Sequence, residues 1–180
     1  MTEALPQVAG SKRVYDGKVV NLRVDTLRRA DGATHDVEVV EHAEAVVVIV
    51  QPRPSQLLLV RQYRHPLGRF NWEVVAGGLD PGETPEAAAA RELREETGYA
   101  ATRVRRLWSA FSAPGFCEEL LHFCIVDEYE IGERSGFDAG EEDMQIGIFE
   151  DDELWRKIRA DELPDSKTQI AVLWALTERA

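Results

Sequence analysis

The sequence predicts an α/β protein that carries a small β-rich unit at its N-terminus. The apolar run Ala45–Val50 consists mostly of β-branched residues, which is typical of a strand buried on both faces. Residues 84–97 predict a helix, because Thr84 can cap its first turn and Gly98 can end it. Short β-like stretches fill residues 11–42. We therefore expect a β-subdomain at residues 11–43 and an α/β domain at residues 44–180.

The remaining elements follow in chain order. Residues 1–10 show no periodic pattern and are expected to form a flexible terminus. In the β-subdomain, Asp31-Gly32 predicts a hairpin between β-like stretches, which lie at 14–15, 18–27 and 36–41. Further strands are expected at 57–63, 104–109, 120–126 and 145–149. Two helices close the chain, at 150–159, where acidic residues precede basic ones, and at about 167–178.

Composition excludes several classes of protein. The 180 residues carry a net charge of −12, and they contain no Lys/Arg tract. Binding to extended nucleic acid is therefore not expected, because it depends on basic residues that attract the phosphate backbone. No apolar run approaches the length of a membrane span, and residues 1–10 lack the order of a signal peptide. We therefore expect a cytoplasmic protein with no nucleic-acid or membrane partner. Cys117 and Cys124 form no metal-binding spacing and are expected to be reduced.

Three carboxylates share one face of the helix expected at 84–97. At 100° per residue, Glu95 and Glu96 lie about 60° and about 40° to either side of Glu92, so the three fall within an arc of about 100°. Like charges at this spacing repel, so a cation should compensate them. One interpretation is a solvated face neutralised by Arg91 and Arg94. The other is a site for a hard divalent cation, which prefers oxygen ligands.

The surroundings of the stripe favour the second interpretation. Gly77 is followed after five residues by Glu83, and after seven more by the run of residues 91–99, RELREETGY. This spacing resembles the signature sequence of the Nudix hydrolases, the Nudix box. Tyr99 departs from it, because a bulky aliphatic residue is usual at the last position.

The resemblance implies a fold, a cofactor and a set of ligands. The fold is an α/β/α sandwich with a mixed sheet, in which the box forms a loop, a helix and a second loop. The cofactor is Mg²⁺, for which Mn²⁺ can substitute. Two roles remain open for Glu83, which could ligate an extra ion or form a salt bridge to Arg91. The implied metal ligands are Glu92 and Glu96, with Glu95 as a third ligand or a neighbour of the ligands, and the backbone carbonyl of Ala76.

The flanks of the box resemble one group within this superfamily, the ADP-ribose pyrophosphatases. Pro114 lies fifteen residues beyond Tyr99, in a loop at 112–119 that is similar to a proline-glycine loop of that group. Residues 60–64 (VRQYR) and 165–168 (DSKT) are similar to the strand before the box and to the start of the last helix. The resemblance covers about residues 12–178. Val75 and Asp80 depart from it, where proline and glutamate are usual.

The resemblance to the ADP-ribose pyrophosphatases also implies substrate contacts and a general base. Arg64 and Arg61 are candidates for a phosphate clamp, because a guanidinium offers paired donors to phosphate oxygens. Arg28 could reach a neighbouring subunit's ligand, although an exposed hairpin arginine is usually only solvated. Further expected substrate contacts are Gly115 and Glu119 of the proline-glycine loop. The expected catalytic carboxylates are Glu142, then Glu141, in an acidic loop, together with Glu95; the alternative is that the metal ligands alone activate the water.

The group also implies an assembly and a reaction. Its N-terminal β-subdomain forms an intertwined homodimer, and a small β unit without a core of its own gains most burial from a partner surface. The alternative is a hairpin packed on its own chain.

The implied reaction is Mg²⁺-dependent hydrolysis of ADP-ribose to AMP and ribose 5-phosphate. The rivals are another nucleoside diphosphate sugar, such as GDP-mannose, and a Nudix module that binds ADP-ribose without cleaving it.

Overall fold

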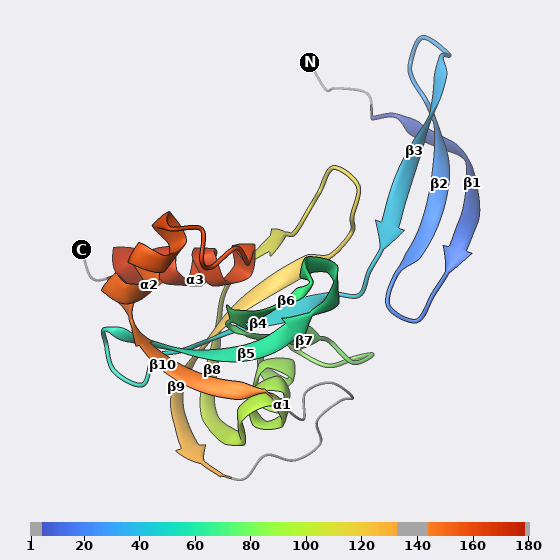
Figure 1. The fold of residues 1–180 in the computed structure, drawn as a ribbon. Coiled ribbons are helices and arrows are strands. Elements are labelled where there is room, and N and C mark those ends of the chain that lie inside the picture. Colours follow the sequence, from blue (N-terminus) through green and yellow to red (C-terminus); the bar gives the residue numbers. More distant parts are fainter. Residues whose placement is uncertain (1–4, 133–143, 179–180) are drawn as a thin grey trace. The chain divides into compact units, whose positions relative to one another are not determined.

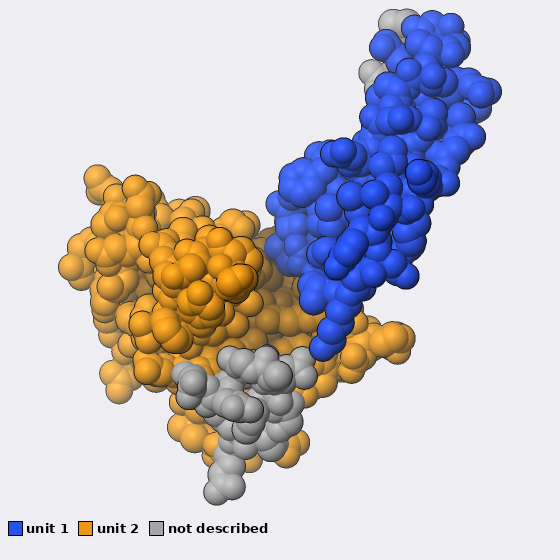
Figure 2. Space-filling model, turned by 45° about the vertical axis from the view of Figure 1, so that its right-hand side comes forward, with its two compact units in different colours: residues 1–44, 109–121 blue, residues 45–108, 122–180 orange. Residues whose placement is uncertain are grey.

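The computed structural model describes residues 5–132 and 144–178, and the chain divides into two units (Figure 2). The first unit comprises residues 1–44 and 109–121, and the second comprises residues 45–108 and 122–180. The change of unit at residues 44 and 45 lies one residue from the expected boundary. The inclusion of 109–121 in the first unit differs from the expectation of one continuous domain at 44–180.

The first unit is built on a three-stranded antiparallel sheet in the order β1-β2-β3. Its strands are β1 (Gln7–Asp16), β2 (Asn21–Arg28) and β3 (Thr34–Glu41) (Figure 1). The expected hairpin joins β2 to β3, and Gly32 takes a left-handed φ of 86° in its turn. The flexible terminus expected at 1–10 is too long, because β1 already begins at Gln7. Residues 7–10 pair with β2 but bury neither face, so their sequence shows no apolar periodicity.

Residues 112–119 attach to the edge of β3. The Val40 N–H donates to the Phe116 carbonyl at 2.7 Å, and the Glu118 N–H donates to the Val40 carbonyl at 3.0 Å. Arg23 in β2 adds two hydrogen bonds to the Glu118 carboxylate, at 2.5 and 3.0 Å. These contacts explain why this segment belongs to the first unit.

The second unit contains a four-stranded and a three-stranded sheet, in the orders β7-β4-β9-β8 and β10-β5-β6. A short 3₁₀ helix, His65–Leu67, joins β5 to β6. Strands β6 and β7 are not among the sequence-based expectations. The bounds are β4 (Ala45–Val50), β5 (Gln56–Arg64), β6 (Arg69–Glu73), β7 (Val75–Gly78), β8 (Tyr99–Phe111), β9 (Leu120–Ile131) and β10 (Gln145–Glu150).

Helices cover the strands of the second unit on two sides. Helix α1 (Pro85–Thr97) packs against β4 and β7, whereas α2 (Asp151–Arg159) and α3 (Ser166–Thr177) pack together on the other side (Figure 1). The expected α/β/α sandwich with a mixed sheet is confirmed. All six residues of β4 are buried, as its β-branched run predicts. No helix in residues 5–132 and 144–178 is long and apolar enough to span a bilayer.

Candidate active site

Local interactions fix both ends of helix α1, which carries the acidic stripe. The Thr84 hydroxyl accepts a hydrogen bond from the Ala87 N–H at 3.3 Å, and Pro85 occupies the first turn. Gly98 takes a left-handed φ of 80°, and its N–H donates to the Arg94 carbonyl at 2.8 Å. A residue with a side chain is strained in this conformation. The helix predicted at 84–97 is therefore confirmed.

Glu92 and Glu96 lie one turn apart on the buried side of α1. Their exposed fractions are 8% and 2%. Gly77 in β7 makes room for the first of them, because a Cβ at this position would overlap the Glu92 carboxylate. Ala76, whose carbonyl is an expected metal ligand, precedes Gly77 in the same strand. The structure thus brings the carboxylate of Glu92 against the strand that precedes the box loop.

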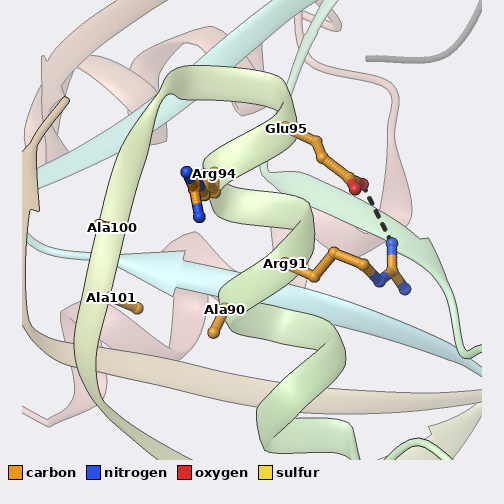
Figure 3. Close-up of a pocket in the computed structure, with 6 residues that line it drawn as sticks. All are labelled: Ala90, Arg91, Arg94, Glu95, Ala100 and Ala101. Atoms are coloured by element: carbon orange, nitrogen blue, oxygen red, sulfur yellow. Dashed lines mark hydrogen bonds and ion pairs between the residues drawn. The ribbon is translucent and has the colours of Figure 1, made fainter. Parts of the chain in front are cut away.

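Arg91 compensates the charge of the stripe. Its Nε and Nη2 donate to Glu83 at 3.1 and 2.8 Å, and its Nη1 donates to Glu92 at 2.6 Å and to Glu95 at 3.1 Å. Figure 3 shows Arg91 and Glu95 reaching toward each other along one side of α1. The hydrogen bonds from Arg91 hold the pKa of Glu83 below its ordinary value. Of the two roles open for Glu83, the structure contains the salt bridge, which ties the loop to the helix.

A cleft of about 520 Å³ opens beside this ion cluster. Alanines form much of its wall, and two arginines and a carboxylate supply its charge. Arg94 extends toward a different side of the helix from the Arg91–Glu95 pair (Figure 3). The lining residues are Ala90, Arg91, Arg94 and Glu95 of α1 and Ala100 and Ala101 of β8.

The donors on α1 and β7 fit a hard divalent cation. Three carboxylates on adjacent turns and a nearby backbone carbonyl provide the oxygen ligands that Mg²⁺ prefers. In the part of the chain that the structure describes, no three acidic, histidine or cysteine side chains converge on one ion position. Arg91 instead engages Glu92 and Glu95 through the same nitrogen. Arg91 Nη1 therefore bonds to oxygens of Glu92 and Glu95 that would ligate an ion.

The two arginines expected to clamp phosphate have different surroundings. They lie three residues apart in β5, so they point to opposite faces of the strand. Arg64 donates to the Glu73 carboxylate, which raises the pKa of Arg64, and the charge of Glu96 adds to this rise. Arg61 lies over the ring of Phe70, 4.5 Å from its centroid, in a cation–π contact.

The remaining expected substrate contacts belong to the first unit. Arg28 is exposed at the end of β2, and Gly115 is exposed in the loop after β8. Glu119 lies 3.5 Å from the Nδ1 of His42. Glu141 and Glu142, the expected general bases, lie outside the described residues.

Sequence reasoning missed a second charged cluster, around Glu73. A cleft of about 320 Å³ lies between β5, β6 and the start of α3, and Arg64, Glu73, Asp165 and Lys167 contribute to its lining. Glu73 ends a strand that the sequence did not predict, so nothing marked its carboxylate as buried. The similarity of 60–64 and 165–168 to one enzyme group was the available signal, because it flagged both sides of this cleft.

Comparison with known proteins agrees with the fold and the box geometry. The model of the NUDIX domain matches residues 41–166. The fold and the carboxylate-bearing loop, helix and loop are those of this class of proteins, and the chain belongs to the Nudix family.

Individual relatives refine this assignment. The chain is 30% identical to an ADP-ribose pyrophosphatase of Bacillus subtilis, over 94% of this chain and 91% of the relative. It is 35% identical to a methanol dehydrogenase activator of Bacillus methanolicus, over 94% and 92%. It is 33% identical to a GDP-mannose pyrophosphatase of Citrobacter koseri, over 82% of each chain. A solved ADP compounds hydrolase shares the fold, with a TM-score of 0.83, 19% identity and coverage of 98% and 96%.

Proposed function

We propose that this protein hydrolyses ADP-ribose to AMP and ribose 5-phosphate with a divalent cation, Mg²⁺ or in its place Mn²⁺. The observation that carries the proposal is the pair of buried carboxylates of the Nudix box, Glu92 and Glu96, the first of which packs against Gly77. The similarity along nearly the whole chain to an ADP-ribose pyrophosphatase supports the choice of substrate.

The charge of the substrate explains the need for a cation. A pyrophosphate repels an incoming hydroxide, so the site must neutralise phosphate oxygens before water can attack. When bound, the cation would supply this neutralisation and would acidify a water molecule. Glu92, Glu95, Glu96 and the Ala76 carbonyl would hold it.

The chain's own residues would orient the substrate and take the proton. Arg64 offers guanidinium donors to the phosphate oxygens. The water oxygen forms a bond to one phosphorus, and the bond from that phosphorus to the bridging oxygen breaks. The bridging oxygen leaves with the other phosphate, and the proton of the water passes to a carboxylate. We assign this base role to Glu142, or to Glu141 beside it.

Hydrolysis of GDP-mannose is the second candidate, because a relative of nearly the same identity is a GDP-mannose pyrophosphatase. A module that binds ADP-ribose without cleaving it is less well supported. Such a module has no need of the buried acidic stripe, whose mutual repulsion costs stability.

The test measures AMP released from ADP-ribose beside GMP released from GDP-mannose, by the purified protein with Mg²⁺ and again with EDTA. The proposal expects AMP to dominate and to vanish with the chelator. If GMP dominates, the substrate assignment is wrong. If neither product forms while ADP-ribose binds, the protein is a sensor.

We also propose a homodimer formed through the first unit. Strand β1 is exposed along its whole length, and the exposed apolar side chains of this unit include Val8, Val14 and Tyr15. A three-stranded sheet with this many exposed apolar side chains gains burial by pairing with a second copy. Light scattering after gel filtration should give twice the chain mass of 20.2 kDa, and a single-chain mass would contradict the dimer. Val14→Asp should shift the mass toward the monomer, whereas Ile131→Asp, at an exposed site in the second unit, should not.

A further inference from the structure

Glu73 is a deeply buried carboxylate to which the proposed reaction assigns no role. It ends β6, and only 2% of its surface is exposed. Arg64 donates to it through Nε, at 3.0 and 3.2 Å from the two oxygens, and through Nη2 at 2.8 Å. Asn71 Nδ2 adds a longer hydrogen bond at 3.3 Å. The carboxylate therefore fixes both the position and the plane of the Arg64 guanidinium.

The same carboxylate also faces the start of helix α3. Lys167 Nζ lies 3.9 Å from Glu73 Oε2 and 2.6 Å from Asp165 Oδ1. The next residue of the chain, Val74, donates its N–H to the Thr168 hydroxyl at 3.0 Å. These contacts fasten the end of β6 to the start of α3 beside the Glu73 carboxylate.

Glu73 engages only part of the Arg64 guanidinium, and the Arg64 side chain also lines the cleft. Glu73 uses its Nε and Nη2, and the Arg64 side chain remains 37% exposed. Nη1 is therefore the nitrogen that Glu73 leaves for a ligand. An unrestrained arginine loses much rotamer freedom when it binds a phosphate, and a guanidinium already held in place loses less.

The geometry points to Glu73 as a positioning residue, which holds the Arg64 guanidinium ready to bind the pyrophosphate of the substrate. An ion pair with a desolvated carboxylate contributes little net stability compared with apolar residues, so stability alone does not explain this one. The inference rests on the proposed function, because it takes Arg64 as a phosphate ligand.

The first test is the variant Glu73→Gln, which removes the charge and one strong acceptor with little change of shape. Calorimetric titration of ADP-ribose in EDTA should show Kd raised about tenfold, the loss expected for one charged hydrogen bond. With Mg²⁺, KM should rise by a similar factor and kcat should change less. An unchanged Kd in a folded variant would overturn the inference.

A double-mutant cycle separates positioning from a structural effect. Arg64→Ala should weaken binding, and Glu73→Gln should weaken it no further in that background, because the group it positions is gone. If the two substitutions raise Kd by the product of their separate factors, their free-energy effects are additive. Glu73 then acts independently of Arg64, and the inference would fall. If Glu73→Gln does not fold, Arg64→Lys replaces it. This variant keeps the charge but loses the planar fork, and binding as tight as that of the wild type would contradict the inference.

Asp127→Asn is the matched control. Asp127 accepts two hydrogen bonds from Arg105, at 2.6 and 2.9 Å, so the variant breaks an arginine–carboxylate pair in β8 and β9. Its Kd should equal that of the wild type, and a tenfold loss here would show that the assay reports general damage. Wild-type protein that neither binds nor cleaves ADP-ribose would refute the proposed function itself. Normal wild-type activity with additive effects would refute only the role of Glu73.

Discussion

Gly77 and Arg91 determine how the acidic stripe is arranged at the scale of single residues. The sequence predicts which carboxylates share a face of α1, because helical periodicity alone decides this. It does not predict that Arg91 bonds to Glu83, Glu92 and Glu95 together. Nor does it predict that Glu92 packs directly on Gly77. Those features depend on side-chain directions and on the approach of β7, which are set by tertiary packing.

The contact between Gly77 and Glu92 can be tested with Gly77→Ala. The new Cβ would displace the Glu92 carboxylate. A shift of about 1 Å in a catalytic group can cost on the order of 100-fold in rate, so we expect kcat/KM for ADP-ribose to fall by about that factor. Steady-state kinetics with Mg²⁺ measures the effect.

Gly78→Ala is the control for this variant. A Cβ at Gly78 meets no atom within 4 Å, so its kinetics should match the wild type. Equal losses of activity in both variants would show that the strand tolerates no side chain at all. Wild-type activity in both variants would show that the close approach of Gly77 to Glu92 does not matter for catalysis.

At the scale of elements, helix ends are better predicted than edge strands. Thr84 and Gly98 specify the ends of α1 by local hydrogen bonding and backbone conformation, which sequence makes visible. Strands β6 and β7 have no comparable signal. They are short, and β7 is half glycine; they form because β5 and β4 supply their partners. The pairing of β7 with β4 joins residues distant in the chain, whereas β6 pairs with β5 across a short link, and its site residue Glu73 was missed with the strand.

The N-cap of α3 gives a stability prediction. Asp165 accepts hydrogen bonds from the N–H and hydroxyl of Thr168 at 2.9 and 2.7 Å. We expect Asp165→Ala to lower the free energy of unfolding by about 1 kcal/mol at neutral pH, the usual value for a lost cap. Urea denaturation followed by circular dichroism measures the difference.

The effect should depend on pH in a defined direction. Burial would raise the pKa of Asp165, but Lys167 and Thr168 outweigh it and hold the pKa below the ordinary 3.8. A carboxyl group with a lowered folded pKa stabilises the protein above its unfolded pKa and loses this effect as the pH falls through the folded value. The gap between wild type and variant should therefore shrink in strong acid. A gap that widens there would contradict the assignment.

At the scale of the whole molecule, the division into two units was only partly predictable. The change of composition near residue 44 marks one boundary, because alternating charged stretches give way to a buried strand. The second boundary, at residues 109–121, depends on backbone pairing between β3 and residues 116–118, far along the chain. No local pattern encodes that pairing.

Arg23 should determine how firmly residues 112–119 are held. It bonds to Asp25, Glu41 and Glu118 together. Arg23→Gln should therefore speed amide hydrogen exchange in residues 112–119, measured by mass spectrometry. Arg13→Gln is the control, because Arg13 bonds to Asp16 and Glu41 within the sheet. Equal exchange in the two variants would show that the backbone pairing with β3 suffices.

The most direct test of the account is the rate of AMP release from ADP-ribose by Glu96→Gln. The change removes one expected metal ligand from the buried stripe but keeps its shape. We expect kcat to fall by about 100-fold or more, the effect of losing about 3 kcal/mol of transition-state stabilisation, with the thermal midpoint almost unchanged. Glu86→Gln, in the first turn of the same helix, should retain full activity. AMP release by Glu96→Gln at the wild-type rate would contradict a catalytic role for the box carboxylates.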